Sequence, residues 1–269
     1  MSIIQIKKEI KKMKITKMLA GGVILLTLFS CSTSDNDAPM MPKIAETPEI
    51  ISSQNKSDNT FSDLSALIAK IKSMTKSEKL TLIGTYKNED IQKINDALVE
   101  LEDVHEDVRV SLDLSKASGI TLLKKDKDIN FYFNTGALSE IILPKGLSNI
   151  GQGAFERCIG LTSVTIPDGV TSIDQGVFEC CRNLVNINIP DSVTSIGYGA
   201  FFHCVSLKSI TIPAGVVSMI DAFDGCSELK VINYKGTEEQ WNAINKGTDY
   251  NAWNRGCPPD MVINYNYKE

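Results

Sequence analysis

Hydrophobic and polar positions recur with a period of 23 residues between about Leu138 and Tyr234. Four residue types mark separate registers of this period: Pro144, Pro167, Pro190 and Pro213; Leu138, Leu161, Leu184 and Leu207; Phe155, Phe178 and Phe201; and Cys158, Cys181 and Cys204. The last block is one residue shorter, so Phe223, Cys226 and Leu229 follow after 22 residues. A fixed period of this length predicts a repeat architecture in which each block forms one coil.

Each block predicts two short strands. In Leu161–Pro167, Leu184–Pro190 and Leu207–Pro213, aliphatic side chains alternate with small polar ones, as in a half-buried strand. Proline then ends the strand because it cannot donate a ladder hydrogen bond. The second strand is shorter, at Val170–Ile173 and Val193–Ile196. The phenylalanine between the two strands is predicted to fill the interior of the coil.

The order of these segments resembles the leucine-rich repeats of the BspA-like group. The shared pattern is proline, Val-Thr-Ser-Ile-Gly, Ala-Phe, cysteine, leucine and Ile-Thr-Ile-Pro, and the resemblance covers about Val110 to the C-terminus. It implies an α+β fold: a leucine-rich-repeat β-solenoid with 23-residue coils at residues 116–234. We expect an N-terminal α/β cap at residues 60–115 and a C-terminal helix/strand cap at residues 235–269, because the end coils of a solenoid need covers.

The N-terminal segment indicates export. Lys14 and Lys17 precede an apolar run from Met18 to Phe29, which is shorter than the ~20 residues of a membrane-spanning helix. Residues 1–30 therefore read as a secretory signal. The ending Leu-Phe-Ser-Cys resembles the lipobox of bacterial lipoproteins, with Cys31 as the lipidated residue. The alternative is an ordinary signal peptide followed by a chance cysteine.

Residues 31–59 are predicted to form a flexible tether, since they are rich in Ser, Asp, Asn and Pro. The stretch Ser32–Asp37 resembles the acidic export signals of Bacteroidetes-type surface lipoproteins. This resemblance implies an outer membrane lipoprotein exposed at the cell surface, attached to the membrane through its lipid only. An ordinary solvated linker has a similar composition.

The expected N-terminal cap reads as helix, strand, helix, strand. One helical stripe contains Leu64, Leu67, Ile68 and Ile71, and a strand follows at Lys79–Thr85. Asn88 is then predicted to cap the second helix, and alternation from Val108 to Leu114 predicts the second strand. The first coil is degenerate: Tyr132 is predicted to stand in the phenylalanine register and Thr135 in the cysteine register.

Two tryptophans follow the repeats. Thr237 and Gln240 have capping-box spacing, and Trp241 lies on the short helix that this spacing predicts. Trp241, Tyr250 and Trp253 permit two interpretations, packing inside the C-terminal cap or an aromatic contact for a sugar ring.

Composition narrows the choice of partners. The formal net charge is −5, and residues 1–30 carry a net +5, so the remainder carries −10. An acidic body of this kind disfavours nucleic acid. Of the seven cysteines, five lie in the repeat block and four follow its period, which favours buried thiols over disulfides. Cys180 and Cys257 fall outside this period.

The sequence predicts no enzyme, no cofactor and no metal site. It has only two histidines, and it lacks a Gly-rich phosphate loop, a His-Glu-x-x-His pair and a Cys-x-x-Cys pair. His203 precedes Cys204, but the repeat register already explains that cysteine. His105 belongs to a charged turn, and an ordinary solvated turn explains these residues more simply than a metal site does.

The candidate binding residues point outward from the longer strand of each coil: Ser163, Thr165, Asn186, Asn188, Ser209, Thr211 and Asn233. Repeat solenoids commonly bind partners over such faces, although a merely solvated face has a similar composition. The resemblance implies adhesion to host proteins, other cells or glycans, and we expect the protein to be a non-catalytic monomer. The alternative is an accessory or structural subunit of an outer-membrane complex, for example one that handles glycans.

Overall fold

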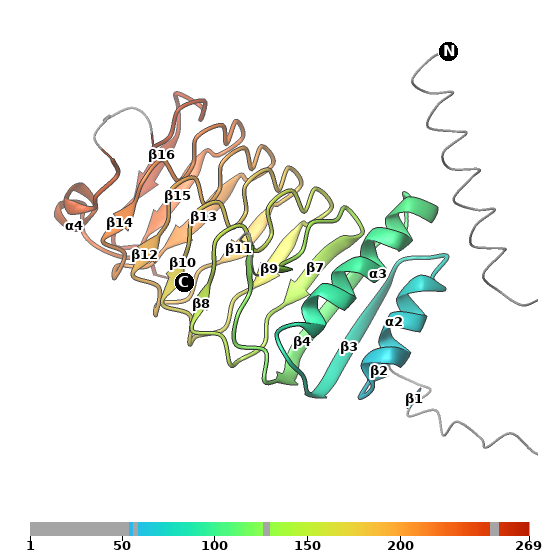
Figure 1. Ribbon diagram of the computed structural model, residues 1–269. Helices are drawn as coiled ribbons and strands as arrows, with labels where there is room; N and C mark the ends of the chain where they lie inside the picture. Colours follow the sequence, from blue (N-terminus) through green and yellow to red (C-terminus); the bar gives the residue numbers. More distant parts are fainter. Residues whose placement is uncertain (1–53, 56–58, 126–129, 248–252, 269) are drawn as a thin grey trace, which may run out of the picture. The chain divides into compact units, whose positions relative to one another are not determined.

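One ten-stranded sheet runs through the chain (Figure 1). The computed structural model describes residues 54–55, 59–125, 130–247 and 253–268. The expected signal peptide and Cys31 lie outside this range, as does most of the expected tether. In the sheet, neighbouring strands follow the order β1-β2-β3-β4-β7-β9-β11-β13-β15-β16, and every pair except β1 with β2 is parallel.

The N-terminal cap is built from helices and strands in the expected order, and its strands belong to the same sheet as the coils. Leu67 and Ile71 on the first helix are fully buried, as are Ile94 and Leu98 on the second. Strand β4 pairs directly with the first coil, so the cap continues the solenoid. The elements are β1 (Gln54–Asn55), β2 (Thr60–Phe61), α2 (Leu64–Lys72), β3 (Glu78–Thr85), α3 (Asp90–Val104) and β4 (Val110–Ser118). Strand β1 thus lies within the stretch expected to be tether.

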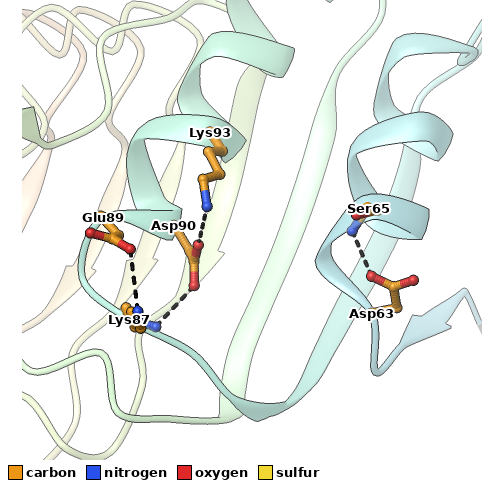
Figure 2. A network of polar contacts seen from close by, with 6 residues as sticks. All are labelled: Asp63, Ser65, Lys87, Glu89, Asp90 and Lys93. Carbon is orange, nitrogen blue, oxygen red and sulfur yellow. Dashed lines mark hydrogen bonds and ion pairs between the residues drawn. The ribbon is translucent and has the colours of Figure 1, made fainter.

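Acidic residues fix the start of each cap helix (Figure 2). Asp63 caps α2 by accepting the backbone N–H of Ser65 at 2.8 Å. Asp90 opens α3, where it accepts the backbone N–H of Lys87 at 2.9 Å and pairs with Lys93 at 2.8 Å. Burial alone would raise the pKa of Asp90, but these two contacts outweigh it and the pKa is lowered.

The repeats form coils with two strands each, as the sequence predicts. The longer strands extend the ten-stranded sheet and the shorter ones form a second, four-stranded parallel sheet. The first set is β7 (Leu138–Ile142), β9 (Ser163–Thr165), β11 (Asn186–Asn188), β13 (Ser209–Ile212), β15 (Val231–Tyr234) and β16 (Val262–Asn264). The second set is β8 (Asn149–Ile150), β10 (Ser172–Ile173), β12 (Ser195–Ile196) and β14 (Ser218–Met219). A separate hairpin pairs β5 (Lys124–Lys125) with β6 (Asn130–Phe131), and a short helix α4 (Glu238–Ala243) follows β15.

A stack of phenylalanine rings fills the interior of the coils. Phe155, Phe178, Phe201 and Phe223 are fully buried, with successive ring centroids 5.3 to 5.5 Å apart and planes within 15°. The ring of Phe133, 5.5 Å from Phe155, begins the stack. The assignment of Tyr132 to this register is therefore wrong by one residue. The degenerate coil places its phenylalanine 22 residues before Phe155, so extrapolating the 23-residue period selects the wrong neighbour.

The last repeat is one residue shorter than the others, and this deletion lies outside the strands. Ser195 still pairs with Ser218, a step of 23 residues, whereas Phe201 stacks on Phe223 after 22. The shortening therefore falls between β14 and the turn. There Asp221, with φ of 46°, takes the left-handed position that Gly199 holds one coil earlier with φ of 60°.

The buried cysteines form hydrogen bonds between coils. The thiols of Cys181, Cys204 and Cys226 donate to the phenylalanine carbonyl of the preceding coil at 3.0 to 3.1 Å. Burial raises the pKa of Cys158 to about 12, so such a thiol stays protonated and keeps its hydrogen for donation. All six cysteines among the described residues are free, as predicted for the ladder.

Cys257 continues the cysteine ladder, contrary to its assignment outside the period. Its thiol donates to the carbonyl of Phe223 at 3.3 Å, the same contact made by the other ladder thiols. Strand β16 then pairs with β15 as the next coil would. The insertion that contains α4 separates Cys257 from Cys226 by 31 residues and hides the period in the sequence. The chain thus adds one further, incomplete coil.

Three side chains of the cap accept backbone N–H groups of the first coil. Asn88 accepts the backbone N–H groups of residues 121 and 122, at 2.8 and 3.1 Å. Asn95 accepts the N–H of Asn134 at 2.9 Å, and Glu102 accepts the N–H of Gly136 at 2.7 Å. These three acceptors are seven residues apart: Asn95 and Glu102 lie on one side of α3, and Asn88 directly precedes the N-cap of this helix. Asn88 is therefore no helix cap, because Glu89 takes the N-cap position and Asn88 binds the first coil.

We expect Phe178→Ala to lower the free energy of unfolding by ~3–5 kcal/mol, because it removes a ring stacked on both sides in the core. Thr165→Ala, on the exposed face of β9, should change it by no more than ~0.5 kcal/mol. Denaturant titration of both variants measures these differences. Equal losses would contradict the assignment of inner and outer positions.

Asn95→Ala should lower the free energy of unfolding by ~1–3 kcal/mol, because it leaves the N–H of Asn134 without its acceptor. Asp96→Ala is the matched control: this residue is next to Asn95 but exposed, and its carboxylate accepts a hydrogen bond from the side chain of Gln92 on the same helix. Thermal unfolding followed by circular dichroism compares the two variants. A loss in Asp96→Ala as large as that in Asn95→Ala would show that the helix, and not its contact with the first coil, is the sensitive feature.

Candidate functional site

The outer face of the large sheet carries two columns of side chains. One column runs through Glu140, Ser163, Asn186, Ser209 and Val231, and the other through Ile142, Thr165, Asn188, Thr211 and Asn233. Neighbours in a column belong to adjacent hydrogen-bonded strands, ~4.8 Å apart. The register predicted from alternation is therefore the register of the structure. We call these two columns the outer face.

The outer face extends further than the sequence indicates. Strand pairing adds Lys79, Ser111, Thr81 and Asp113 at the N-terminal end, all from strands assigned to the cap. At the C-terminal end, Val262 and Asn264 continue the columns on β16. Alternation in β3 and β4 already indicates their outward residues, but only the pairing of β3 with β4 and of β4 with β7 joins these residues to the repeat columns.

The middle of the outer face is uncharged and hollowed. A depression of about 310 Å³ lies over β9, β11 and β13, with Ser163, Thr165, Asn188, Ser209 and Thr211 among its lining residues. Backbone and inner residues form its floor, including Ile187 and Ile210, which are 7% and 2% exposed. The side chain of Asn186 lies outside what the structure describes.

Polar groups in this hollow remain available to a ligand. Side chains at the two ends of the columns bind each other: Ser111 donates to Glu140 at 3.0 Å, and Asn264 donates to Asn233 at 2.9 Å. By contrast, the hydroxyls of Thr165 and Ser209 make no hydrogen bond to another described side chain. The face thus presents a row of hydroxyl and amide groups that can both donate and accept hydrogen bonds.

The two tryptophans do not form a surface for stacking. Trp241 is 3% exposed and Trp253 is 9% exposed, and their ring centroids are 5.7 Å apart. Trp241 also packs at 5.3 Å on Tyr234, and Lys246 covers it at 4.8 Å from the ring centroid. This corrects the alternative of an aromatic sugar contact at Trp241 and Trp253. Both rings close the C-terminal end of the core, and Tyr250 lies outside the described residues.

The cysteine and histidine residues do not assemble a nucleophilic pair. Cys204 is fully buried, and burial raises its pKa well above the ordinary value, whereas His203 is exposed with its ring against Phe202 at 4.2 Å. Within the described residues no group of three or more His, Cys, Asp or Glu side chains could hold a metal ion. In the same part of the chain, no helix has the length and apolar character needed to cross a membrane.

Comparisons with solved structures return bacterial leucine-rich repeat proteins. A leucine-rich repeat protein from T. pallidum is 23% identical, with 68% of this chain and 79% of that chain covered and a TM-score of 0.47. One from Bacteroides ovatus is 28% identical over 42% of this chain and 39% of that chain, with a TM-score of 0.32. A leucine-rich cell surface protein from Faecalibacterium prausnitzii is 19% identical over 64% and 76%, with a TM-score of 0.26. No curated protein matches the chain significantly.

The family comparison agrees with the observed coils. The family model described as a BspA-type leucine-rich repeat region matches residues 128–245 in six copies. This range includes the strands from β7 to β15 and the stack of phenylalanine rings from Phe133 to Phe223. The chain therefore contains a leucine-rich repeat region of the BspA type, folded as a parallel β-solenoid.

Proposed function

We propose that this protein is a non-catalytic adhesion protein that binds a macromolecule through the outer face of its large sheet. The observation that supports this most directly is the uncharged hollow over β9, β11 and β13. Repeat solenoids commonly bind partners over extended faces of this kind, and a BspA-type repeat region suggests interaction or adhesion. Hydroxyl and amide groups at strand spacing suit a glycan or an extended peptide on a host or bacterial surface.

The tether and lipid complete this proposal. We propose that Cys31 carries the lipid and that the polar stretch after it holds the solenoid away from the outer membrane, at the cell surface. The support is the lipobox-like sequence Leu-Phe-Ser-Cys and the polar composition of residues 32–59. A rigid solenoid on a flexible tether can present its outer face to a partner at several orientations.

The double variant Thr165→Arg, Asn188→Arg should abolish partner binding and leave folding intact. These residues pair across β9 and β11, and both are exposed, so two long charged side chains would occupy the hollow without entering the core. A glycan array and a panel of extracellular-matrix proteins, probed with the full-length protein, identify the ligand. Surface plasmon resonance then compares its affinity for the two proteins.

A matched control uses the second sheet of the same coils. Thr171→Arg with Thr194→Arg also introduces two arginines at exposed positions of adjacent coils, where the backbone N–H of Thr194 bonds to Thr171. This control should retain binding. Undiminished binding by the Thr165, Asn188 variant would show that the outer face is not the contact surface. A ligand lost equally from both variants would indicate a nonspecific effect of added charge.

Cys31→Ser should release the protein from membranes or stall its processing. Each buried acyl CH₂ contributes ~0.8 kcal/mol, and stable anchoring requires more than one acyl chain, so removing the acylated residue removes the anchor. Cell fractionation with detection of the mature and precursor forms measures the effect. Normal processing and continued membrane association of the variant would contradict the lipoprotein proposal.

A further inference from the structure

A second hollow lies away from the outer face, where the end of α3 meets the turns of the first three coils. It has a volume of about 710 Å³, within the range typical of ligand sites. Its lining includes Arg109, which follows α3, and Arg157 and Arg182 from successive coils. We call this hollow the arginine cleft.

The arginine cleft concentrates a residue that is otherwise rare in this chain. The sequence contains four arginines, at 109, 157, 182 and 255, against 24 lysines. Three of the four line the cleft, and the fourth, Arg255, lies outside it and pairs with Asp224 at 3.2 Å. A guanidinium group presents a planar fork of donors that matches a carboxylate, which a lysine ammonium cannot do.

Arg109 and Arg157 differ in how firmly other groups of the protein hold their guanidinium groups. Arg109 donates to the carbonyls of Glu106 and Val108, at 2.6 and 3.1 Å, which fixes its guanidinium at the rim. The side chain of Arg157 is 67% exposed, and its contact with the neighbouring Glu156 is long, at 3.7 Å. Exposed ion pairs of this kind contribute little and yield readily to a better partner.

Gly136 lines the cleft where Glu102 and Ile159 approach its backbone closely. A Cβ at this position would lie 2.6 Å from Glu102 Oε1 and 3.2 Å from the side chain of Ile159, so a larger residue would displace these side chains. Glu102 itself is occupied on its other oxygen, which accepts from Thr135 and from the N–H of Gly136. The cleft therefore brings guanidinium donors together with carboxylate and amide acceptors, among them Glu102 and Asn183.

From this arrangement we infer that the arginine cleft binds an acidic oligosaccharide, one whose sugar rings carry a carboxylate. The carboxylate is received by Arg157 and Arg182, and ring hydroxyls donate to Glu102 and to Asn183. A sugar suits the cleft because the lining mixes charged and amide side chains with Ile159, Cys180 and two glycines, so it offers hydrogen bonds to ring hydroxyls and apolar contact to the ring carbons. Glu102 and Glu106, which also line the cleft, disfavour a phosphate more than a carboxylate because a phosphate carries more negative charge.

The test measures binding of a galacturonic acid tetrasaccharide to the full-length protein by isothermal titration calorimetry, beside the same tetrasaccharide with its carboxyl groups methyl-esterified. We expect the acidic form to bind and the ester to bind at least about tenfold more weakly. In the variant Arg157→Asn, Arg182→Gln, affinity for the acidic form should fall by a similar factor. Asparagine is used at position 157 because it tolerates the φ of 63° found there.

Controls separate this site from general charge and from the outer face. Arg255→Gln removes an arginine outside the cleft and should bind the acidic sugar normally, and so should Thr165→Arg with Asn188→Arg. Equal binding of acid and ester, undiminished binding by the Arg157, Arg182 variant, or no binding of the acidic sugar would each overturn the inference. An acidic peptide that binds through the same arginines while the sugar does not would also overturn it.

Discussion

Each coil needs backbone hydrogen-bond partners on its neighbouring coils, and the rest of the structure depends on this requirement. The N–H groups of Phe155, Phe178 and Phe201 donate to carbonyls of the following coil at 2.8 to 2.9 Å. On the second sheet, Asp174 and Gly197 donate in the opposite direction, to the preceding coil. Because buried backbone groups must be paired, each coil has to repeat the path of its neighbour, and the side chains stack as a consequence.

The same constraint explains the two ends. At the N-terminal end, Asn88, Asn95 and Glu102 reach from the cap and pair backbone N–H groups of the first coil. At the other end the chain inserts α4 and then returns to the coil path at Cys257. Trp253 packs edge-on against the last phenylalanine of the stack, Phe223, and Trp241 packs against Trp253.

Backbone pairing fixes the path of each coil but leaves the outward side chains free to vary. The two candidate sites differ in whether their side chains repeat from coil to coil. The outer face repeats because it sits on the strands, so each coil adds one more hydroxyl or amide to a column. The arginine cleft does not repeat, because part of its lining comes from the end of α3 and the residues that follow it. A repeated surface suits a long partner, whereas a unique cleft suits a small ligand.

The sequence by itself determined the features that belong to one coil. A residue such as Phe178 or Thr165 has its inward or outward direction set by alternation within a few residues, so the period sufficed to assign both. Tertiary structure decided whatever depends on pairing between distant segments. Phe133 replaces Tyr132 in the stack, Cys257 rejoins the ladder after an insertion, and Asn88 binds the first coil instead of capping a helix. The arginine cleft is of this kind too: its arginines are up to 73 residues apart in the sequence, at 109, 157 and 182, and only the stacking of coils against α3 brings them to one surface.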